Sequence, residues 1–285
     1  MQRPAAGSIM KDHRIGCNTL YPGVEERRQK GWTFSPQKIM EALDKLSEIG
    51  YTDVEYSHIY HLSVDDAIRI GEHARKLGIN SWSCHAAGPA GFNTGDVREA
   101  SVKANCHCID ISDALGAGVN VLHIGNHSYE DACRILEPVC RYAVEKNVEI
   151  ALENTKGLED MEFILKLART VDVPNLGICV DTGHANLRDL GAPRAIRMAG
   201  KLLLTTHLQD NLGQRDDHMP PGMGVIDWED VFRALKEIGY ERTLMLELTD
   251  APTAGSRVYN QEEEIKTGLR NVRKFLQLLC PSNDD

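Results

Sequence analysis

Short apolar runs alternate with amphipathic segments along the whole chain. The runs are rich in Val, Ile and Leu, and they are near-continuous in apolar character, which is typical of parallel strands covered on both faces. We predict strands at residues 15–20, 53–57, 80–85, 120–125, 149–154, 176–181, 202–208 and 243–248.

The segments between these runs carry the start and stop signals of helices. Ser35 followed by Pro36 places an N-cap residue before a proline at the first helical position. Two serines each precede an aspartate by three residues, which resembles a capping box although Asp stands where Glu or Gln is preferred. These pairs are Ser63 with Asp66 and Ser128 with Asp131. We expect helices to end at residues that tolerate a left-handed backbone, namely Gly50, Gly78, Gly118, Asn147 and Gly239.

The sequence contains a faint internal repeat, in which a helix end is followed by a glycine turn and then a strand. Residues 47–56 resemble residues 236–246 in this way. Eight such units in one chain indicate a closed barrel more than an open sheet. No stretch rich in Pro, Gly or Ser divides the sequence. The fold class we predict is α/β, a (β/α)8 TIM barrel, as one domain over residues 1–285 with mobile tails at 1–12 and 281–285.

Polar side chains stand at the ends of six consecutive predicted strands. The active site of a TIM barrel lies at the carboxyl ends of its strands, so these residues are expected at one rim. The strand-end residues are His85, His123, Glu153, Asp181 with His184, His207 and Glu247.

The alternation of side chains along a strand sharpens this placement. Alternate residues point to opposite faces, so each terminal acid or imidazole shares the inner face with a smaller neighbour. On the strand at 202–208, His207 then points inward and Leu204 points toward the helices. The pattern places these residues inside: Ala151, Glu153, Gly177, Cys179, Asp181, Thr205, His207, Met245 and Glu247.

Several carboxylates in one barrel mouth repel one another and lose hydration. A divalent cation removes both penalties, and three carboxylates with one imidazole suit Mn²⁺, Mg²⁺, Co²⁺ or Zn²⁺. We therefore predict one divalent metal held by Glu153, Asp181, His207 and Glu247. The alternative is a set of hydrogen-bonded rim residues without metal, which would be favoured if only one such residue were present.

The loop after the strand at 202–208 is also rich in polar residues. We predict that Asp227 is the N-cap of the next helix. For Asp216, Asp217 and His218, a solvated loop and a ligand-binding loop are equally compatible with the spacing. The aromatic candidates for contact with a ligand are Trp32 and Trp82, and for Trp82 we favour core packing.

The formal net charge of −10 argues against a general nucleic-acid binder and favours a small-molecule substrate. The sequence has no apolar run long enough for a membrane span and no signal-peptide pattern. The eight cysteines are scattered without a CxxC pair, which indicates reduced and mostly buried thiols in a cytoplasmic protein.

Five motifs in order resemble a known superfamily: ALEN at 151–154, CVDTGH at 179–184, HLQDN at 207–211, DHMPPGMGVIDW at 217–228 and LELT at 246–249. On these motifs the chain is identified as a member of the xylose isomerase-like TIM barrels, also called the sugar phosphate isomerase/epimerase or AP endonuclease 2 superfamily. The resemblance runs from the first predicted strand to the last helix. Relatives of this kind are often homo-oligomers.

The resemblance to the ketose 3-epimerases of this superfamily implies roles for individual residues. It implies that Glu153, Asp181, His207 and Glu247 bind one divalent metal, and that Glu153 and Glu247 are also the acid/base pair on opposite faces of the substrate. His184 matches a substrate-binding histidine. Those enzymes carry an arginine ahead of the PG turn, where this chain has His218 nearest and Arg215 displaced by three residues.

The chain also resembles endonuclease IV, a repair nuclease of the same superfamily with a three-zinc site. The net charge of −10 and the lack of evident basic loops speak against a nuclease. The matching positions are His85, His123, Glu153, Asp181, His184, His207, Asp216, His218 and Glu247.

We hypothesise an isomerase or epimerase of a sugar or keto-sugar that transfers a proton α to a carbonyl through a metal-stabilised enediolate. One of Glu153 and Glu247 removes the proton and the other returns one. A sugar dehydratase or lyase shares the first half-reaction and stays open, as does a barrel that binds without turnover. No Gly-rich phosphate loop indicates a phosphorylated substrate. Candidate substrate-binding residues are His184, His218, His85, His123 and Asp216.

Overall fold

Eight parallel strands form one sheet in the order β7-β6-β5-β4-β3-β2-β1-β8 in the computed structural model. The structure describes residues 13–19, 34–85, 97–125, 127–155, 157–248 and 261–279. The strands are β1 (Ile15–Asn18), β2 (Asp53–Ser57), β3 (Asn80–His85), β4 (Val119–Leu122), β5 (Glu149–Glu153), β6 (Leu176–Asp181), β7 (Leu203–His207) and β8 (Leu244–Leu246).

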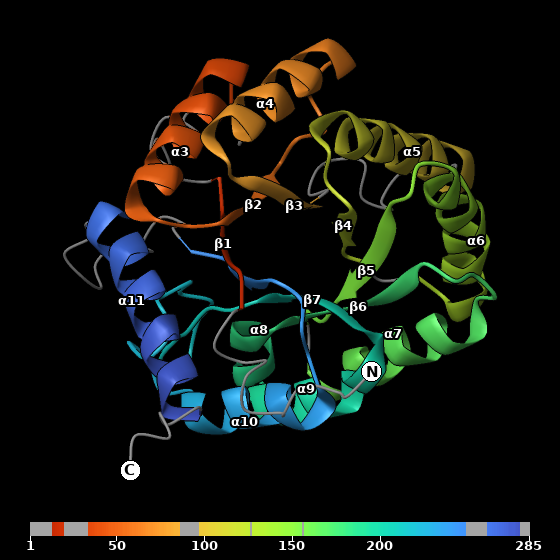
Figure 1. Ribbon diagram of the computed structural model, residues 1–285. Helices are drawn as coiled ribbons and strands as arrows, with labels where there is room; N and C mark the ends of the chain where they lie inside the picture. Colours follow the sequence, from red (N-terminus) through yellow and green to blue (C-terminus); the bar gives the residue numbers. More distant parts are fainter. Residues whose placement is uncertain are drawn as a thin grey trace, which may run out of the picture.

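The two ends of this sheet meet and close it into a barrel. Leu208, directly after β7, bridges to Leu246 of β8, and the Leu208 amide donates to the carbonyl of Met245 at 2.8 Å. The helices stand around the strands as an outer ring (Figure 1). The predicted (β/α)8 TIM barrel is therefore confirmed.

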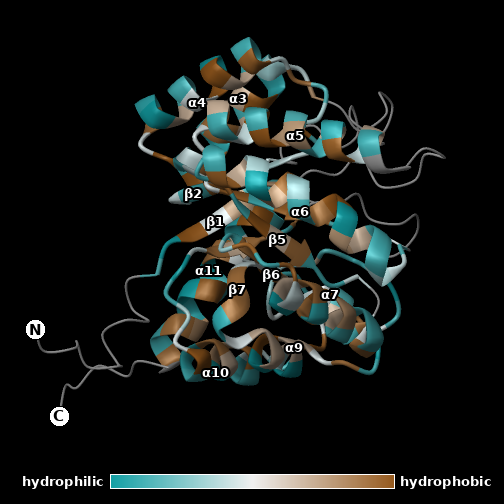
Figure 2. Ribbon diagram, turned by 90° about the vertical axis from the view of Figure 1, so that its right-hand side faces the viewer, coloured by the Kyte–Doolittle hydropathy of each residue, from teal (hydrophilic) through white to brown (hydrophobic). Residues whose placement is uncertain are grey.

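The outer ring consists of helices that follow the strands in turn. The helices labelled in Figure 2 carry both hydrophilic and hydrophobic residues, as expected where one side of a helix packs on the barrel and the other faces water. The helices are α3 (Pro36–Ile49), α4 (Val64–Leu77), α5 (Val97–Leu115), α6 (Tyr129–Glu145), α7 (Leu158–Thr170), α8 (Thr182–Asn186), α9 (Ala192–Ala199), η2 (Gly200–Leu202), α10 (Trp228–Ile238) and α11 (Gln261–Leu279).

The predicted helix starts are confirmed. The side chains of Ser35, Ser63 and Ser128 each accept a hydrogen bond from the backbone amide three residues later. Asp227 caps α10 in the same way, through the amide of Asp230. Each of these caps satisfies a backbone amide that has no partner within the helix.

The helix ends agree with the prediction except after α5. Gly50, Gly78 and Gly239 are left-handed C-caps, and Asn147 has a φ of 55° just after α6. The expectation for Gly118 is wrong, because α5 ends at Leu115 and Gly116 takes the left-handed φ of 80°. The predicted mobile tails, together with Trp32 and Cys280, lie outside the described residues.

A small apolar cluster fills the barrel interior beneath its mouth. It joins Val119, Val121, Ala151, Cys179 and Leu204, with Trp82 packed against them. The Trp82 indole donates to the Thr205 hydroxyl at 3.0 Å, on the inner face. The prediction that Trp82 belongs to the core is confirmed.

The predicted outward direction of Leu204 is wrong. The register between β6 and β7 shifts, so that Ile178 pairs with Leu203 and Cys179 pairs with Thr205. Leu204 is left over by this bulge and turns inward above Gly177, where an added Cβ would lie 2.6 Å from Leu204 Cγ. Gly177 therefore leaves the space that Leu204 occupies.

Among the described residues, no helix is both long and apolar enough to cross a bilayer. The seven described cysteines are all free thiols. Five of them are buried, as the sequence predicts, and Cys106 and Cys133 are partly exposed.

Candidate metal centre and active site

The carboxyl ends of β5 to β8 bring four polar side chains together in the barrel mouth. Glu153 ends β5, Asp181 ends β6, His207 ends β7, and Glu247 follows β8 directly. One ligand atom from each lies within 4.8 Å of those of the other three, and all four residues are buried. The four residues that the sequence analysis selects as metal ligands are therefore neighbours in space.

His207 is the centre of this group. Its Nδ1 lies 3.2 Å from Glu153 Oε2 and 3.0 Å from Glu247 Oε2. None of these three buried atoms makes a hydrogen bond to a described protein group, and neither does Glu153 Oε1. Buried polar atoms normally have a partner. Three carboxylates and an imidazole with such unpaired atoms fit a divalent, oxygen- and nitrogen-preferring cation.

Hydrogen bonds from Asn154 and from the His184 amide fix the orientation of Asp181. The side chain of Asn154 bonds both to the Asp181 amide at 2.9 Å and to the Asp181 carbonyl at 3.0 Å. Asp181 Oδ1 accepts from the His184 amide at 2.7 Å, because Asp181 is the N-cap of α8. Asp181 thus presents its second oxygen, Oδ2, to the mouth, where Gln209 Nε2 lies 3.3 Å away.

The charges of the site are strongly coupled. Burial by itself disfavours ionised carboxylates, yet His123 and His207 hold the pKa of Glu153 well below its usual range. His207 likewise lowers the pKa of Glu247 against the effect of burial. Burial and the neighbouring glutamates raise the pKa of Asp181 to about 7. Two carboxylates are thus held as anions, and a third needs a cation to ionise fully at neutral pH.

Two further histidines border Glu153 on the side of β3 and β4. His123 Nε2 lies 3.0 Å from Glu153 Oε2 and 3.2 Å from His85 Nε2. His85 Nδ1 lies 3.4 Å from Glu247 Oε1. His85, His123 and Glu153 form a second group with ligand atoms within 4.8 Å. His123 is the exposed member, so this side of the mouth is open to solvent.

A third group lies on the other side of the mouth. Asp216 Oδ2 lies 3.1 Å from His184 Nε2 and 2.9 Å from His218 Nε2. His184 Nδ1 in turn lies 3.2 Å from Glu153 Oε1. His184, Asp216 and His218 thus have ligand atoms within 4.8 Å of one another, and Asp216 is also exposed to solvent, so both predictions for this loop stay open. Arg215 turns to Asp217 instead, with 3.4 Å between Nη2 and Oδ1.

The loop that carries Asp216 and His218 is held by Asp210, a residue that the sequence analysis does not select. The fully buried Asp210 carboxylate accepts from the amides of Gly222 and Gly224 at 3.0 and 2.9 Å. A Cβ on Gly224 would lie 2.3 Å from Asp210 Oδ1, so only glycine fits this approach.

Glu55 on β2 is the other functional candidate absent from the sequence analysis. It is fully buried and lies 3.1 Å from His207 Nε2. The signal was present in the sequence, because Asp53 and Glu55 alternate in β2 as inward residues do.

Comparison with known proteins identifies the family of the chain. The model of the xylose isomerase-like TIM barrel family matches residues 43–275. The chain belongs to this family.

Three known proteins that are similar to the chain illustrate the likeness. The protein y4fM of Sinorhizobium fredii is 26% identical over an alignment of 250 residues, and the match covers 73% of this chain and 80% of that protein. A D-psicose 3-epimerase of Enterocloster bolteae is 23% identical over 256 residues, 80% of this chain and 82% of that enzyme. The structure of an L-ribulose 3-epimerase has a TM-score of 0.77 at 19% identity and covers 94% of this chain and 95% of that chain. These likenesses agree with the observed fold.

Proposed function

We propose that the protein is a divalent-metal-dependent epimerase or isomerase of a keto-sugar. The observation that carries this proposal is the buried group of Glu153, Asp181, His207 and Glu247 in the barrel mouth, in which ligand atoms of Glu153, His207 and Glu247 make no hydrogen bond to a described protein group. A divalent cation held there supplies Lewis-acid stabilisation for the negative charge of an enediolate. The similarity to enzymes named D-psicose and L-ribulose 3-epimerase supports a ketose as substrate.

Glu153 and Glu247 are the proposed acid/base pair. They flank His207 from β5 and from the end of β8, and their lowered pKa values keep them in the ionised form that a general base needs. One glutamate removes the proton α to the carbonyl. For epimerisation, the other returns a proton to the opposite face of the same carbon.

Neighbouring imidazoles can exchange protons with this pair. His184 Nδ1 lies 3.2 Å from Glu153 Oε1, and His85 Nδ1 lies 3.4 Å from Glu247 Oε1. Each glutamate therefore has a proton donor within reach for the return step. His123 is exposed at the edge of the group and His218 is buried beside Asp216, and we propose that both bind substrate hydroxyl groups.

The direct test is proton exchange. The metal-loaded protein is incubated in D₂O with psicose, tagatose and ribulose, and the α-proton signal is followed by NMR. We expect loss of this signal together with a new C3 epimer, and neither with Glu153→Gln. Exchange followed by loss of a hydroxyl group would instead indicate a dehydratase or lyase. A metal-loaded protein that exchanges no α-proton of any ketose would contradict the proposal.

A three-metal phosphodiester hydrolase, as in endonuclease IV, is the second candidate function. Two observations favour it, namely the ligand groups His85–His123–Glu153 and His184–Asp216–His218 on either side of the first group. Against it stands the net charge of −10, since DNA binding requires a basic surface. Elemental analysis separates the two candidates, because the epimerase predicts one divalent metal per chain and the hydrolase predicts three.

A further inference from the structure

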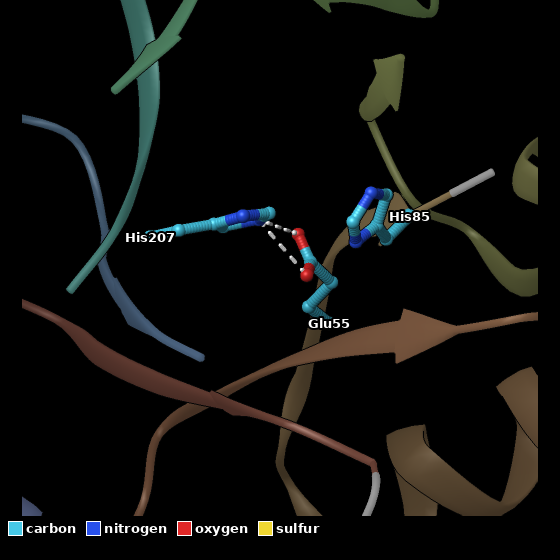
Figure 3. A group of neighbouring side chains, drawn as sticks. All are labelled: Glu55, His85 and His207. Carbon is cyan, nitrogen blue, oxygen red and sulfur yellow. Dashed lines mark hydrogen bonds and ion pairs between the residues drawn. The ribbon is translucent and has the colours of Figure 1, made fainter. Parts of the chain in front are cut away.

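The imidazole of His207 is held between carboxylates on both of its edges. Nδ1 faces the candidate metal ligands, at 3.2 Å from Glu153 Oε2 and 3.0 Å from Glu247 Oε2. Nε2 faces Glu55, at 3.1 Å from each of its two oxygens. Figure 3 shows the Glu55 carboxylate beside the His207 ring, with both contacts marked. The two nitrogens of one ring therefore have different partners.

The Glu55 carboxylate is itself held in place. It is fully buried, and the Ser83 hydroxyl on β3 donates to Glu55 Oε2 at 2.7 Å. β2 and β7 are not neighbours in the sheet, so the contact between Glu55 and His207 crosses the barrel interior. Burying a carboxylate is unfavourable unless its oxygens are hydrogen-bonded or paired, whereas burying an apolar side chain is favourable. A glutamate at this position therefore needs a role that an apolar residue could not fill.

The chemistry of imidazole supplies this role. A nitrogen that binds a cation uses its lone pair, so His207 Nδ1 must carry no proton and Nε2 must carry one. An ionised carboxylate only accepts hydrogen bonds. It therefore favours the form with the proton on Nε2 and fixes the plane of the ring.

We infer that Glu55 is a positioning residue that holds His207 as the Nε2–H form, with the Nδ1 lone pair directed at Glu153 and Glu247. The inference rests on the proposed metal site, and it adds a residue from β2 to a site otherwise built from β5 to β8. Glu55, His85 and His207 also have ligand atoms within 4.8 Å of one another, so the test below distinguishes a positioning role of Glu55 from a ligand role.

Replacing Glu55→Gln tests this inference with little change of shape. Ser83 continues to donate to the amide oxygen at the Oε2 position, and the amide NH₂ group takes the Oε1 position, which also lies 3.1 Å from His207 Nε2. The variant loses the negative charge and one of the two acceptors that face Nε2, so the preference for a proton on Nε2 over Nδ1 weakens. We expect Mn²⁺ affinity to fall about 10- to 100-fold. In the chelator-stripped protein reloaded with Co²⁺, the visible absorption spectrum should change while the far-ultraviolet circular dichroism stays as in the wild type.

Asp53→Asn is the matched control, since Asp53 is equally buried on β2 but bonds to Arg14 and Asn80 at the opposite end of the barrel. It should leave the Mn²⁺ affinity unchanged. Ser83→Ala keeps the Glu55 carboxylate but removes its anchor, so it should weaken Mn²⁺ binding to a smaller extent, even if Glu55→Gln fails to fold.

Three results would overturn the inference. If Glu55→Gln, Ser83→Ala and the wild type had equal Mn²⁺ affinity and equal Co²⁺ spectra, the inference would be wrong and the proposed function would be unaffected. A loss of one bound metal per chain, with the affinity of the remaining metal unchanged, would mean that Glu55 is a ligand. No metal binding by the wild type would overturn the proposed function as well.

Discussion

The carboxylate of Asp210 accepts a hydrogen bond from the indole nitrogen of Trp228 at 2.7 Å. The same carboxylate binds the backbone amides of Gly222, Gly224 and Ile226. One buried anion thus closes the loop between β7 and α10 and sets the position of the segment that carries Asp216 and His218. The Asp210 carboxylate adds to the backbone hydrogen bonds of the loop, among them the pair between Asp210 and Met219.

Asp210→Asn should open this loop. The amide lacks the charge and offers one acceptor oxygen where the carboxylate offers two, so at least one buried donor loses its partner. We expect a loss of roughly 1–3 kcal/mol in the free energy of unfolding. Trypsin should cleave faster after Arg215, which lies in the loop. The control is Asp227→Asn, because Asn is an equally good N-cap for α10. Equal cleavage rates for both variants would refute the role of Asp210.

The cysteines should divide into slow and fast groups toward a thiol reagent at pH 8. Burial raises the pKa of Cys108 and of Cys140 to about 12, so both stay protonated and unreactive at this pH. Cys17, Cys84 and Cys179 are fully buried and should be equally slow. Of the described cysteines, only Cys106 and Cys133 are partly exposed and should react in the native protein, with Cys106 slowed because burial and the nearby Asp110 raise its pKa. All eight should react in denaturant, and rapid native labelling of the buried five would contradict the observed packing.

The sequence predicts the barrel well because each strand and helix carries a local signal. Apolar runs and capping serines depend on neighbours in the chain, and alternation along a strand places Glu153 and Glu247 on one face. Leu204 differs, since its inward turn follows from a register shift between two strands. The alternation of residues within β7 alone does not indicate that shift.

The missed residues act over long sequence distances. Asp210 accepts hydrogen bonds from groups 12 to 18 positions later in the sequence. No local sequence pattern indicates that an aspartate will bind distant backbone amides. Glu55 meets His207 across 152 positions. Alternation in β2 predicts that Glu55 points inward, but only the closed barrel shows which imidazole it meets.

Glu153→Gln and Glu247→Gln should each abolish most of the turnover. Each removes an acid/base group, which is worth about 10²- to 10⁴-fold in rate, and weakens a metal ligand as well. The steady-state rate on the ketose found by the exchange experiment measures this. Glu149→Gln is the matched control, because Glu149 lies on β5 too but pairs with Arg242 at the opposite end of the strand. A Glu149→Gln variant as inactive as Glu153→Gln would point to a general loss of structure.

Removal of the metal should lower both activity and thermal stability. A ligand that binds only the folded protein stabilises it by about 2.7 kcal/mol at 100 times its dissociation constant. Treatment with a chelator should therefore lower the unfolding temperature in calorimetry, and Mn²⁺ should restore it.

Asp181→Asn separates this effect from damage to the fold. The Asn side chain still accepts from the His184 amide, so α8 keeps its N-cap. The variant loses the carboxylate oxygen directed at the site. We expect its unfolding temperature without metal to match that of the wild type, and the added stabilisation by Mn²⁺ to be lost. If Mn²⁺ stabilised the variant as much as the wild type, Asp181 would not be a ligand, and the four-residue site would need another donor.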